Sequence, residues 1–87
     1  MEFEFDPAKS EANKAKHGID FVEAQRLWLD NGAVRFPSDR FGEKRWGLIA
    51  RSSGKVWTVF FTIRDGIVRI ISVRRARVEE VIFYEGN

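Results

Sequence analysis

The sequence predicts an α+β domain with a short N-terminal strand, a two-helix hairpin, an antiparallel sheet of three to four strands and a C-terminal helix. Capping residues mark out two short helices in the first third of the chain. Further on, Asp65 and Gly66 form a two-residue hairpin signal between two apolar runs. After Val73 the apolar spacing changes from that of a strand to that of a helix. The chain of 87 residues suits one domain, which is expected over residues 1–87.

The N-terminal segment predicts a short edge strand and then a helix. Phe3 and Phe5 alternate with glutamates, which is typical of a strand with one buried face. Asp6 is a good N-cap and Pro7 a good first helical residue, so a helix is expected over residues 7–17. Its small side chains recur on one face, which is expected to lie close to the supporting sheet: Ala8, Ala12 and Ala15.

A second helix is predicted directly after the first. Gly18 supplies the left-handed residue that ends the first helix. Asp20 and Glu23, three residues apart, form an N-terminal capping box, and Asn31 with Gly32 ends the helix. The side chains expected to point inward are Phe21, Ala24, Leu27 and Trp28.

Apolar runs predict the strands of the sheet over residues 45–50, 56–63 and 67–73. The preceding segment, 35–45, mixes turn formers with basic residues, so it is expected to be a strand end followed by an exposed loop. Placing Arg64 opposite Ile67 sets the register of the last hairpin. The residues then expected to share one face are Val59 with Ser72, Phe61 with Ile70, and Ile63 with Val68.

The last predicted element is a helix in the run RRARVEEVIFYEGN. Val78, Ile82 and either Phe83 or Tyr84 recur at helical spacing, and this face is expected to pack back on the sheet. Glu79 and Glu80 are expected on the exposed side.

Positive charge is concentrated in the middle of the chain. Residues 1–34 carry four Lys or Arg against seven Asp or Glu, whereas residues 35–77 carry eleven against three. Such a field is typical of a protein that binds nucleic acid or an acidic partner. A solvated basic surface is the alternative interpretation.

Other compositional features exclude several classes of site. There is no cysteine and one histidine, so disulfides and Cys-based zinc sites are excluded, and neither a metal nor a cofactor is expected. No apolar run approaches the roughly 20 residues of a membrane span. The N-terminus is acidic, unlike a signal peptide, so the cytoplasm is the expected location and no membrane contact is expected.

His17 admits two interpretations. The end of a helix favours the protonated imidazole, which suits a general acid or base. Equally, His17 simply caps the helix.

The C-terminal arginines also admit two interpretations. Arg74 and Arg75, with Arg69 and Arg77 nearby, lie at the end of the last strand. Guanidinium groups bind phosphate in a bidentate fork and stabilise a phosphorane. Alternatively, a basic edge keeps the sheet from pairing with other chains.

Two stretches of the sequence resemble the BrnT toxins of bacterial type II toxin–antitoxin systems. One is the opening pattern F-D-x-x-K-x-x-x-N-x-x-K-H-G-I-x-F-x-E-A, from Phe5 to Ala24. The other is the pattern R-I-I-S-x-R-R-A, from Arg69 to Ala76. The resemblance spans nearly the whole chain, and the two patterns together are more specific than either alone.

The resemblance implies a metal-independent ribonuclease toxin with a fold like that of the RelE toxins, which inhibits translation and growth. It also implies neutralisation by BrnA, a ribbon-helix-helix antitoxin that binds operator DNA. The active site of the family maps to Arg64, Arg74 and Arg75, with Arg45 and His17 as further members by motif position.

RNA binding is further expected of three residues: Lys16, Arg69 and Arg77. Because the pKa of arginine exceeds about 12, His17 or Lys16 is the predicted proton carrier. The alternative function is a basic RNA- or protein-binding module without catalysis, acting as corepressor or scaffold with a DNA-binding partner.

Overall fold

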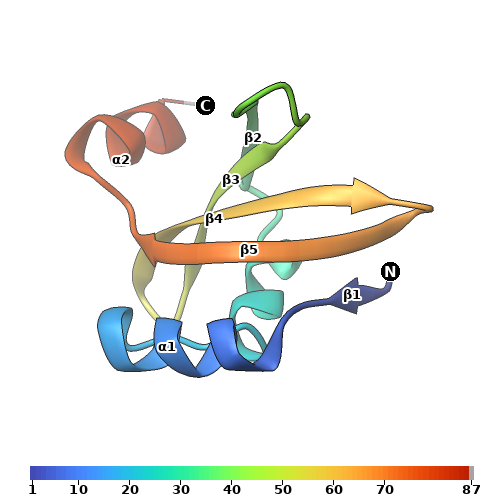
Figure 1. The fold of residues 1–87 in the computed structure, drawn as a ribbon. Coiled ribbons are helices and arrows are strands. Elements are labelled where there is room, and N and C mark those ends of the chain that lie inside the picture. Colours follow the sequence, from blue (N-terminus) through green and yellow to red (C-terminus); the bar gives the residue numbers. More distant parts are fainter. Residues whose placement is uncertain (87) are drawn as a thin grey trace.

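The computed structural model describes residues 1–86, which form a five-stranded sheet with helices on both faces (Figure 1). The elements in chain order are β1 (Phe3–Glu4), α1 (Pro7–His17), the 3-10 helix η1 (Glu23–Leu29), β2 (Val34–Pro37), β3 (Trp46–Ser52), β4 (Lys55–Arg64), β5 (Ile67–Arg75) and α2 (Val78–Glu85). The strand order is β1-β5-β4-β3-β2, with β1 parallel to β5 and the other pairs antiparallel. The α+β class is thus confirmed, and the sheet is mixed rather than wholly antiparallel.

The two faces of the sheet have different coverings. Figure 1 shows α1 on one side of the sheet and α2 on the other. The hydrophobic core lies on the α1 face, where side chains of η1 and of the preceding turn meet alternate residues of β3, β4 and β5. Its members with at most 1% exposure are Phe21, Ala24, Leu27, Ala50, Val59, Phe61 and Val73. The strand residues that alternate with these core residues point to the α2 face.

The β4–β5 hairpin keeps the predicted register for only part of its length. Arg64 pairs with Ile67 across a turn in which Asp65 and Gly66 are both left-handed, with φ of 52° and 78°. Ile63 with Val68 and Phe61 with Ile70 also pair as predicted. Beyond that point a bulge shifts the register, so Phe60 pairs with Ser72 and Val59 with Val73. The predicted pairing of Val59 with Ser72 is therefore wrong, because Ile71 is an extra residue in β5.

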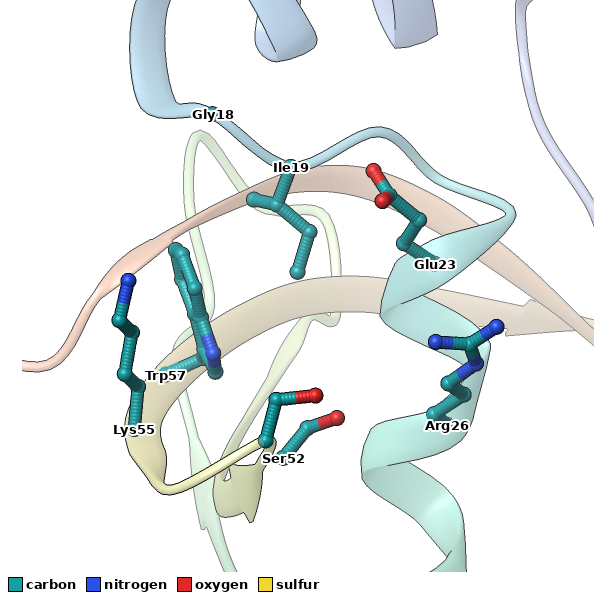
Figure 2. Close-up of a pocket in the computed structure, with 8 residues that line it drawn as sticks. Gly18, Ile19, Glu23, Arg26, Ser52, Lys55 and Trp57 are labelled. Carbon is teal, nitrogen blue, oxygen red and sulfur yellow. The ribbon is translucent and has the colours of Figure 1, made fainter.

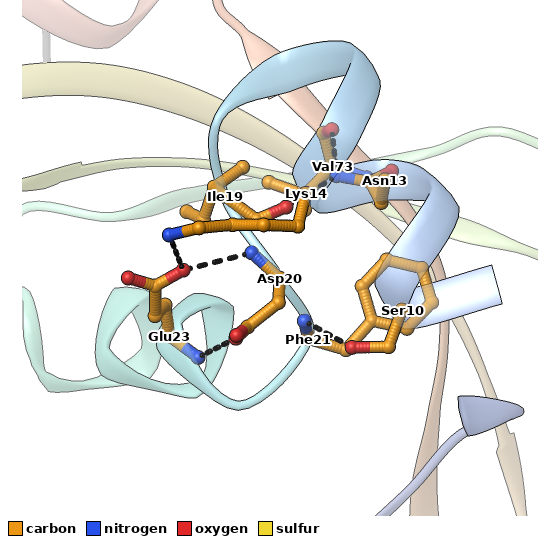
Figure 3. A network of polar contacts seen from close by, with 8 residues as sticks. All are labelled: Ser10, Asn13, Lys14, Ile19, Asp20, Phe21, Glu23 and Val73. Atoms are coloured by element: carbon orange, nitrogen blue, oxygen red, sulfur yellow. Dashed lines mark hydrogen bonds and ion pairs between the residues drawn. The ribbon is translucent and has the colours of Figure 1, made fainter. Parts of the chain in front are cut away.

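α1 packs through a polar face rather than through its alanines. Ala8, Ala12 and Ala15 are exposed, whereas Ser10 and Asn13 are buried. The reason is hydrogen bonding, because these two side chains satisfy backbone groups of neighbouring segments (Figure 3). The predicted alanine contact is wrong, although the helix begins and ends as expected.

The Asn13 side chain ties α1 to two other parts of the chain. Its Nδ2 donates to the carbonyl oxygens of Ile19, at 2.8 Å, and Val73, at 2.9 Å. Its Oδ1 accepts from the Val73 N–H at 3.3 Å. One amide thereby joins α1, the turn after it and the middle of β5.

The second helix keeps its predicted capping box, but it begins later than predicted, at Glu23, ends at Leu29 and has a different pitch. The capping box forms, with Glu23 N–H donating to Asp20 at 2.7 Å and Asp20 N–H donating to Glu23 at 2.9 Å (Figure 3). The element is a 3-10 helix rather than an α-helix. Ala24 and Leu27 of this helix, together with Phe21 of the turn before it, are all buried and recur every three residues, and three residues per turn place such side chains in one row.

α2 presents to the sheet the side that was predicted to be exposed. Val78 and Ile82 are 75% and 65% exposed, so their predicted packing is wrong. Glu80 instead points to the sheet and accepts from the Thr58 hydroxyl at 3.0 Å. The Tyr84 hydroxyl donates to Asp30 at 2.6 Å. Polar contacts to the buried Thr58 and the half-buried Asp30 thus hold α2 where an apolar stripe was expected.

Candidate active site

β5 sends its two consecutive arginines to opposite faces of the sheet. Arg74 pairs with Thr58 and reaches Glu80 of α2, so it lies on the α2 face. Arg75 pairs with Trp57, a member of the core, and its guanidinium lies 5.5 Å from the centre of that ring. Successive residues of a strand alternate in this way. The two arginines predicted to act together are therefore separated by the sheet.

The α2 face holds a cavity of about 390 Å³ that is rich in arginine, here called the arginine cavity. Its lining comes from the turn between β2 and β3, from β4 and β5, and from the start of α2: Ser38, Arg40, Arg45, Phe60, Ile71, Ser72, Arg74 and Arg77. Three predicted residues, Arg45, Arg74 and Arg77, thus meet in one place. Arg40, a residue that the sequence did not single out, joins them.

Arg74 is held in the cavity wall by a two-pronged ion pair. Its Nη1 and Nη2 donate to Oε1 and Oε2 of Glu80 at 2.8 and 3.0 Å. Burial of the Glu80 carboxyl opposes its ionisation, but hydrogen bonds from Arg74, the Arg77 N–H and Thr58 outweigh burial and lower the pKa of Glu80. The side chains of Arg74 and Glu80 are only 21% and 15% exposed, so the guanidinium is well oriented.

Glu43 connects two further arginines. Its Oε1 accepts from Arg45 Nε at 2.6 Å, and its Oε2 lies 3.5 Å from Arg64 Nη2. The hydrogen bond from Arg45 is the main reason that the pKa of Glu43 lies below its usual range. Arg64 therefore adjoins the arginine cavity through Glu43, without lining it.

Arg69 also lies on the α2 face of β5, where it pairs with Thr62 in the ladder. Its Nη1 is 3.2 Å from Glu4 of β1. It lies farther along the strand than Arg74, outside the lining of the arginine cavity.

His17 and Lys16 lie away from this cavity, at the end of α1. Gly18, with φ of 78°, ends the helix by donating its N–H to the Lys14 carbonyl at 2.9 Å, as predicted. His17 is half-buried and Lys16 is exposed, and neither lines the arginine cavity. The structure thus separates the predicted proton carrier from the predicted phosphate clamp.

A smaller cavity of about 190 Å³ lies beside the end of α1 (Figure 2). Its wall contains two cations, Arg26 and Lys55, one carboxylate, Glu23, and the apolar side chains of Ile19 and Trp57. The carboxylate is already bound to Lys14 at 2.7 Å. This wall is less basic than that of the arginine cavity, which is therefore the better match to an RNA phosphate.

Within residues 1–86, no three side chains of His, Cys, Asp or Glu are grouped so that they could hold a metal ion. No helix of the same residues is long and apolar enough to cross a membrane.

The carboxylates that orient the arginines, Glu43 and Glu80, were not predicted as site residues. A signal for Glu80 exists in the sequence, because it stands three residues after Arg77 at the start of a helix. The Arg77 N–H donates to Glu80 at 2.7 Å, as in a capping box. Glu43 has no comparable signal, because its partners depend on the turn between β2 and β3.

Comparison with known families identifies the chain. The family described as "Ribonuclease toxin, BrnT, of type II toxin-antitoxin system" matches residues 5–80. This range contains both sequence patterns and the whole lining of the arginine cavity. Individually curated proteins give no match. The chain belongs to the BrnT family of ribonuclease toxins of type II toxin–antitoxin systems.

Proposed function

We propose that this toxin cleaves RNA without a metal ion and that the scissile phosphate binds in the arginine cavity. The observation that carries the proposal is the convergence of Arg40, Arg45, Arg74 and Arg77 on one cavity. RNA cleavage by the 2′-hydroxyl passes through a dianionic phosphorane, and fixed guanidinium groups stabilise that charge. Arginines thereby supply the positive charge that a metal ion supplies in other nucleases.

Arg74 retains donors for a phosphate while it is held by Glu80. A guanidinium has five N–H groups. Within residues 1–86, two of these groups donate to Glu80 and one donates to the Arg75 carbonyl, which leaves two. Arg74 can therefore clamp a phosphate without leaving its position in the wall.

A carboxylate of the same cluster is our proposed general base. Arginine is too weak a base, and His17 ends α1, which lies on the side of the sheet opposite to α2 (Figure 1). Glu43 hydrogen-bonds to Arg45, and its lowered pKa keeps it ionised at neutral pH. A phosphate that takes over the Arg45 donors leaves Glu43 free to accept the 2′-hydroxyl proton. The 2′-oxygen then bonds to phosphorus and the bond to the 5′-oxygen breaks, with a proton from solvent, giving a 2′,3′-cyclic phosphate and a 5′-hydroxyl.

We predict that purified toxin cleaves single-stranded RNA in excess EDTA and leaves 2′,3′-cyclic phosphate ends. An ordinary glutamate has a pKa of about 4.3, and the hydrogen bond from Arg45 lowers the pKa of Glu43 further in the free protein, so this base is ionised above about pH 5.5 with or without that bond. The cleavage rate should therefore change little between about pH 5.5 and 7.5, where a histidine of ordinary pKa near 6.5 would titrate. Single-turnover rates over this range provide the measurement. Activity that requires added Mg²⁺, or a rate that drops tenfold per unit below about pH 6.5, would contradict the proposal.

We predict that His17→Asn keeps cleavage within about twofold of wild type, since His17 lies outside the arginine cavity. Asparagine is accepted at helix ends, so the free energy of unfolding should fall by less than about 1 kcal/mol. Cleavage rate and urea denaturation of the purified variant give the two values. A folded variant that is slower by about a hundredfold would restore His17 as a proton carrier.

We also propose that residues 1–87 form one RelE-like domain that acts in the cytoplasm. In this proposal a BrnA-like ribbon-helix-helix antitoxin neutralises the toxin and carries the complex to operator DNA. Membership of a type II toxin–antitoxin family supports the presence of an antitoxin. Arg69 and Arg77, on the α2 face with Arg74, are proposed to bind RNA phosphates on either side of the scissile one. Lys16, on α1, is proposed to make a further RNA contact away from the arginine cavity.

A further inference from the structure

The segment predicted as a loop between β2 and β3 is a tight hairpin with an aromatic residue at its tip. The N–H groups of Arg40 and Glu43 each donate to the carbonyl of the other residue at 2.9 Å. One step further back, Ser38 N–H donates to the Arg45 carbonyl at 2.8 Å. Phe41 and Gly42 form the turn, with φ of 51° and 78°. The hydrogen bonds hold the position of the turn.

Phe41 is an unusual residue for this turn. The other two turns of the same kind in the sheet place Ser53 and Asp65 at the corresponding position, with φ of 54° and 52°. Short polar residues tolerate the left-handed conformation, whereas a bulky aromatic residue is strained there. Moreover, Phe41 is 94% exposed, so its ring contributes nothing to the core. Strain and exposure together indicate a role other than folding.

The position of Phe41 connects it to the arginine cavity. Arg40 and Arg45, which flank the turn, both line that cavity. The Arg40 guanidinium lies 5.4 Å from the centre of the Phe41 ring. An exposed aromatic face therefore stands beside a group of phosphate-binding cations. Single-stranded nucleic acid is recognised by this combination, with bases on aromatic rings and backbone on basic side chains.

We propose that Phe41 stacks against an unpaired nucleobase of the RNA, next to the phosphate held in the arginine cavity. The inference rests on the proposed function of that cavity. Every base presents a π face, so this contact positions the strand without demanding one particular base. Phe41 is thus a positioning residue for cleavage, and the Arg40 guanidinium, 5.4 Å from the centre of its ring, lies beside the proposed stacking contact.

The test uses a 2′-O-methyl RNA oligonucleotide, which the toxin cannot cleave, with 2-aminopurine placed at successive positions. Binding to wild type should quench the probe at one position, because stacking quenches its fluorescence. Phe41→Ala and Phe41→Asn should abolish the quenching and weaken binding by about tenfold, within the range for loss of one stacked base. Phe41→Trp should retain both. Asparagine accepts the left-handed turn, so Phe41→Asn should be at least as stable as wild type.

Leu29→Ala is the matched control, because Leu29 is an exposed apolar residue, at 80%, outside the arginine cavity. It should change neither quenching nor affinity. An abasic nucleotide at the quenched position should weaken binding to wild type as much as Phe41→Ala does. It should cause no further loss of affinity in Phe41→Ala, because the stacking contact is already absent there.

If Phe41→Ala binds the RNA and quenches the 2-aminopurine probe as wild type does, the proposal is wrong. If that variant loses binding to the antitoxin alone, Phe41 is a protein contact and the proposal also fails. Arg74→Gln distinguishes this failure from failure of the cavity itself. If Arg74→Gln binds and cleaves RNA as wild type does while quenching at Phe41 persists, the cavity is misassigned and the stacking contact stands.

Discussion

Arg74→Gln is expected to lower the rate of RNA cleavage by at least about a hundredfold, the usual cost of removing a fixed donor from a transition state. The guanidinium is oriented by Glu80 and lines the arginine cavity, whereas glutamine keeps polarity but loses the charge. Single-turnover cleavage of one RNA substrate in EDTA measures the effect. RNA affinity should fall less than the rate, since the phosphorane carries more charge than the bound phosphate.

Arg75→Gln is the matched control for this prediction. Arg75 is adjacent to Arg74 in the chain, and its substitution removes the same charged group. Its side chain, however, lies beside Trp57 on the other face of the sheet. Its cleavage rate should stay within about threefold of wild type. Equal losses from the two substitutions would show that the arginine cavity is not where the phosphate binds.

Loss of Arg74 also leaves Glu80 without its main partner in a partly buried position. The unpaired Glu80 carboxylate destabilises the fold, so a lower cleavage rate in Arg74→Gln could come from unfolding as well as from lost catalysis. The double variant Arg74→Gln, Glu80→Gln removes both charges, so it should recover stability without recovering cleavage. Urea denaturation of Arg74→Gln, Arg75→Gln and the double variant gives the free energy of unfolding of each, which separates effects on folding from effects on catalysis. Recovery of cleavage in the double variant would mean that Arg74 only balances Glu80.

Local signals in the sequence predicted the elements of the fold better than the contacts between them. Asp6, Gly18 and the pair of Asp65 and Gly66 specify backbone geometry by their own chemistry, and each takes the predicted role. Packing depends on partners far away in the chain. Asn13 is buried because β5 and the turn after α1 offer it three backbone groups, which no pattern within α1 reveals.

The residues of the candidate site were partly predicted, since Arg45, Arg74 and Arg77 line one cavity, whereas its geometry was not predicted. Two adjacent arginines at a strand end indicate a phosphate site. Which of the two points to α2 depends on the bulge near Ile71, because one extra residue moves every later side chain of the strand to the other face. Without that bulge, Arg75 would share the face of α2 and Arg74 that of the core. The sequence marks the extra residue only by a break in alternation at the adjacent apolar residues Ile70 and Ile71, which the predicted register did not take into account.

Asn13→Ala is expected to lower the free energy of unfolding by about 3 kcal/mol or more, because each buried partner left without a hydrogen bond costs roughly 1–3 kcal/mol. The substitution removes the hydrogen bonds to the Ile19 carbonyl and to both backbone groups of Val73. Small domains are stable by only about 5–15 kcal/mol, so the loss is a large fraction of the total. Urea denaturation followed by tryptophan fluorescence gives the value.

Two further variants show whether this cost arises from hydrogen bonding. Asn13→Asp preserves the shape of the side chain but turns an acceptor toward the carbonyls of Ile19 and Val73, so it should destabilise at least as much as alanine. Ser10→Ala leaves only the Phe21 N–H unpaired and should cost about a third as much. Because Val73 precedes Arg74, Asn13→Ala should also lower the cleavage rate under conditions where the protein is still folded. A loss of stability below about 1 kcal/mol in both Asn13 variants would mean that water replaces the side chain at this junction.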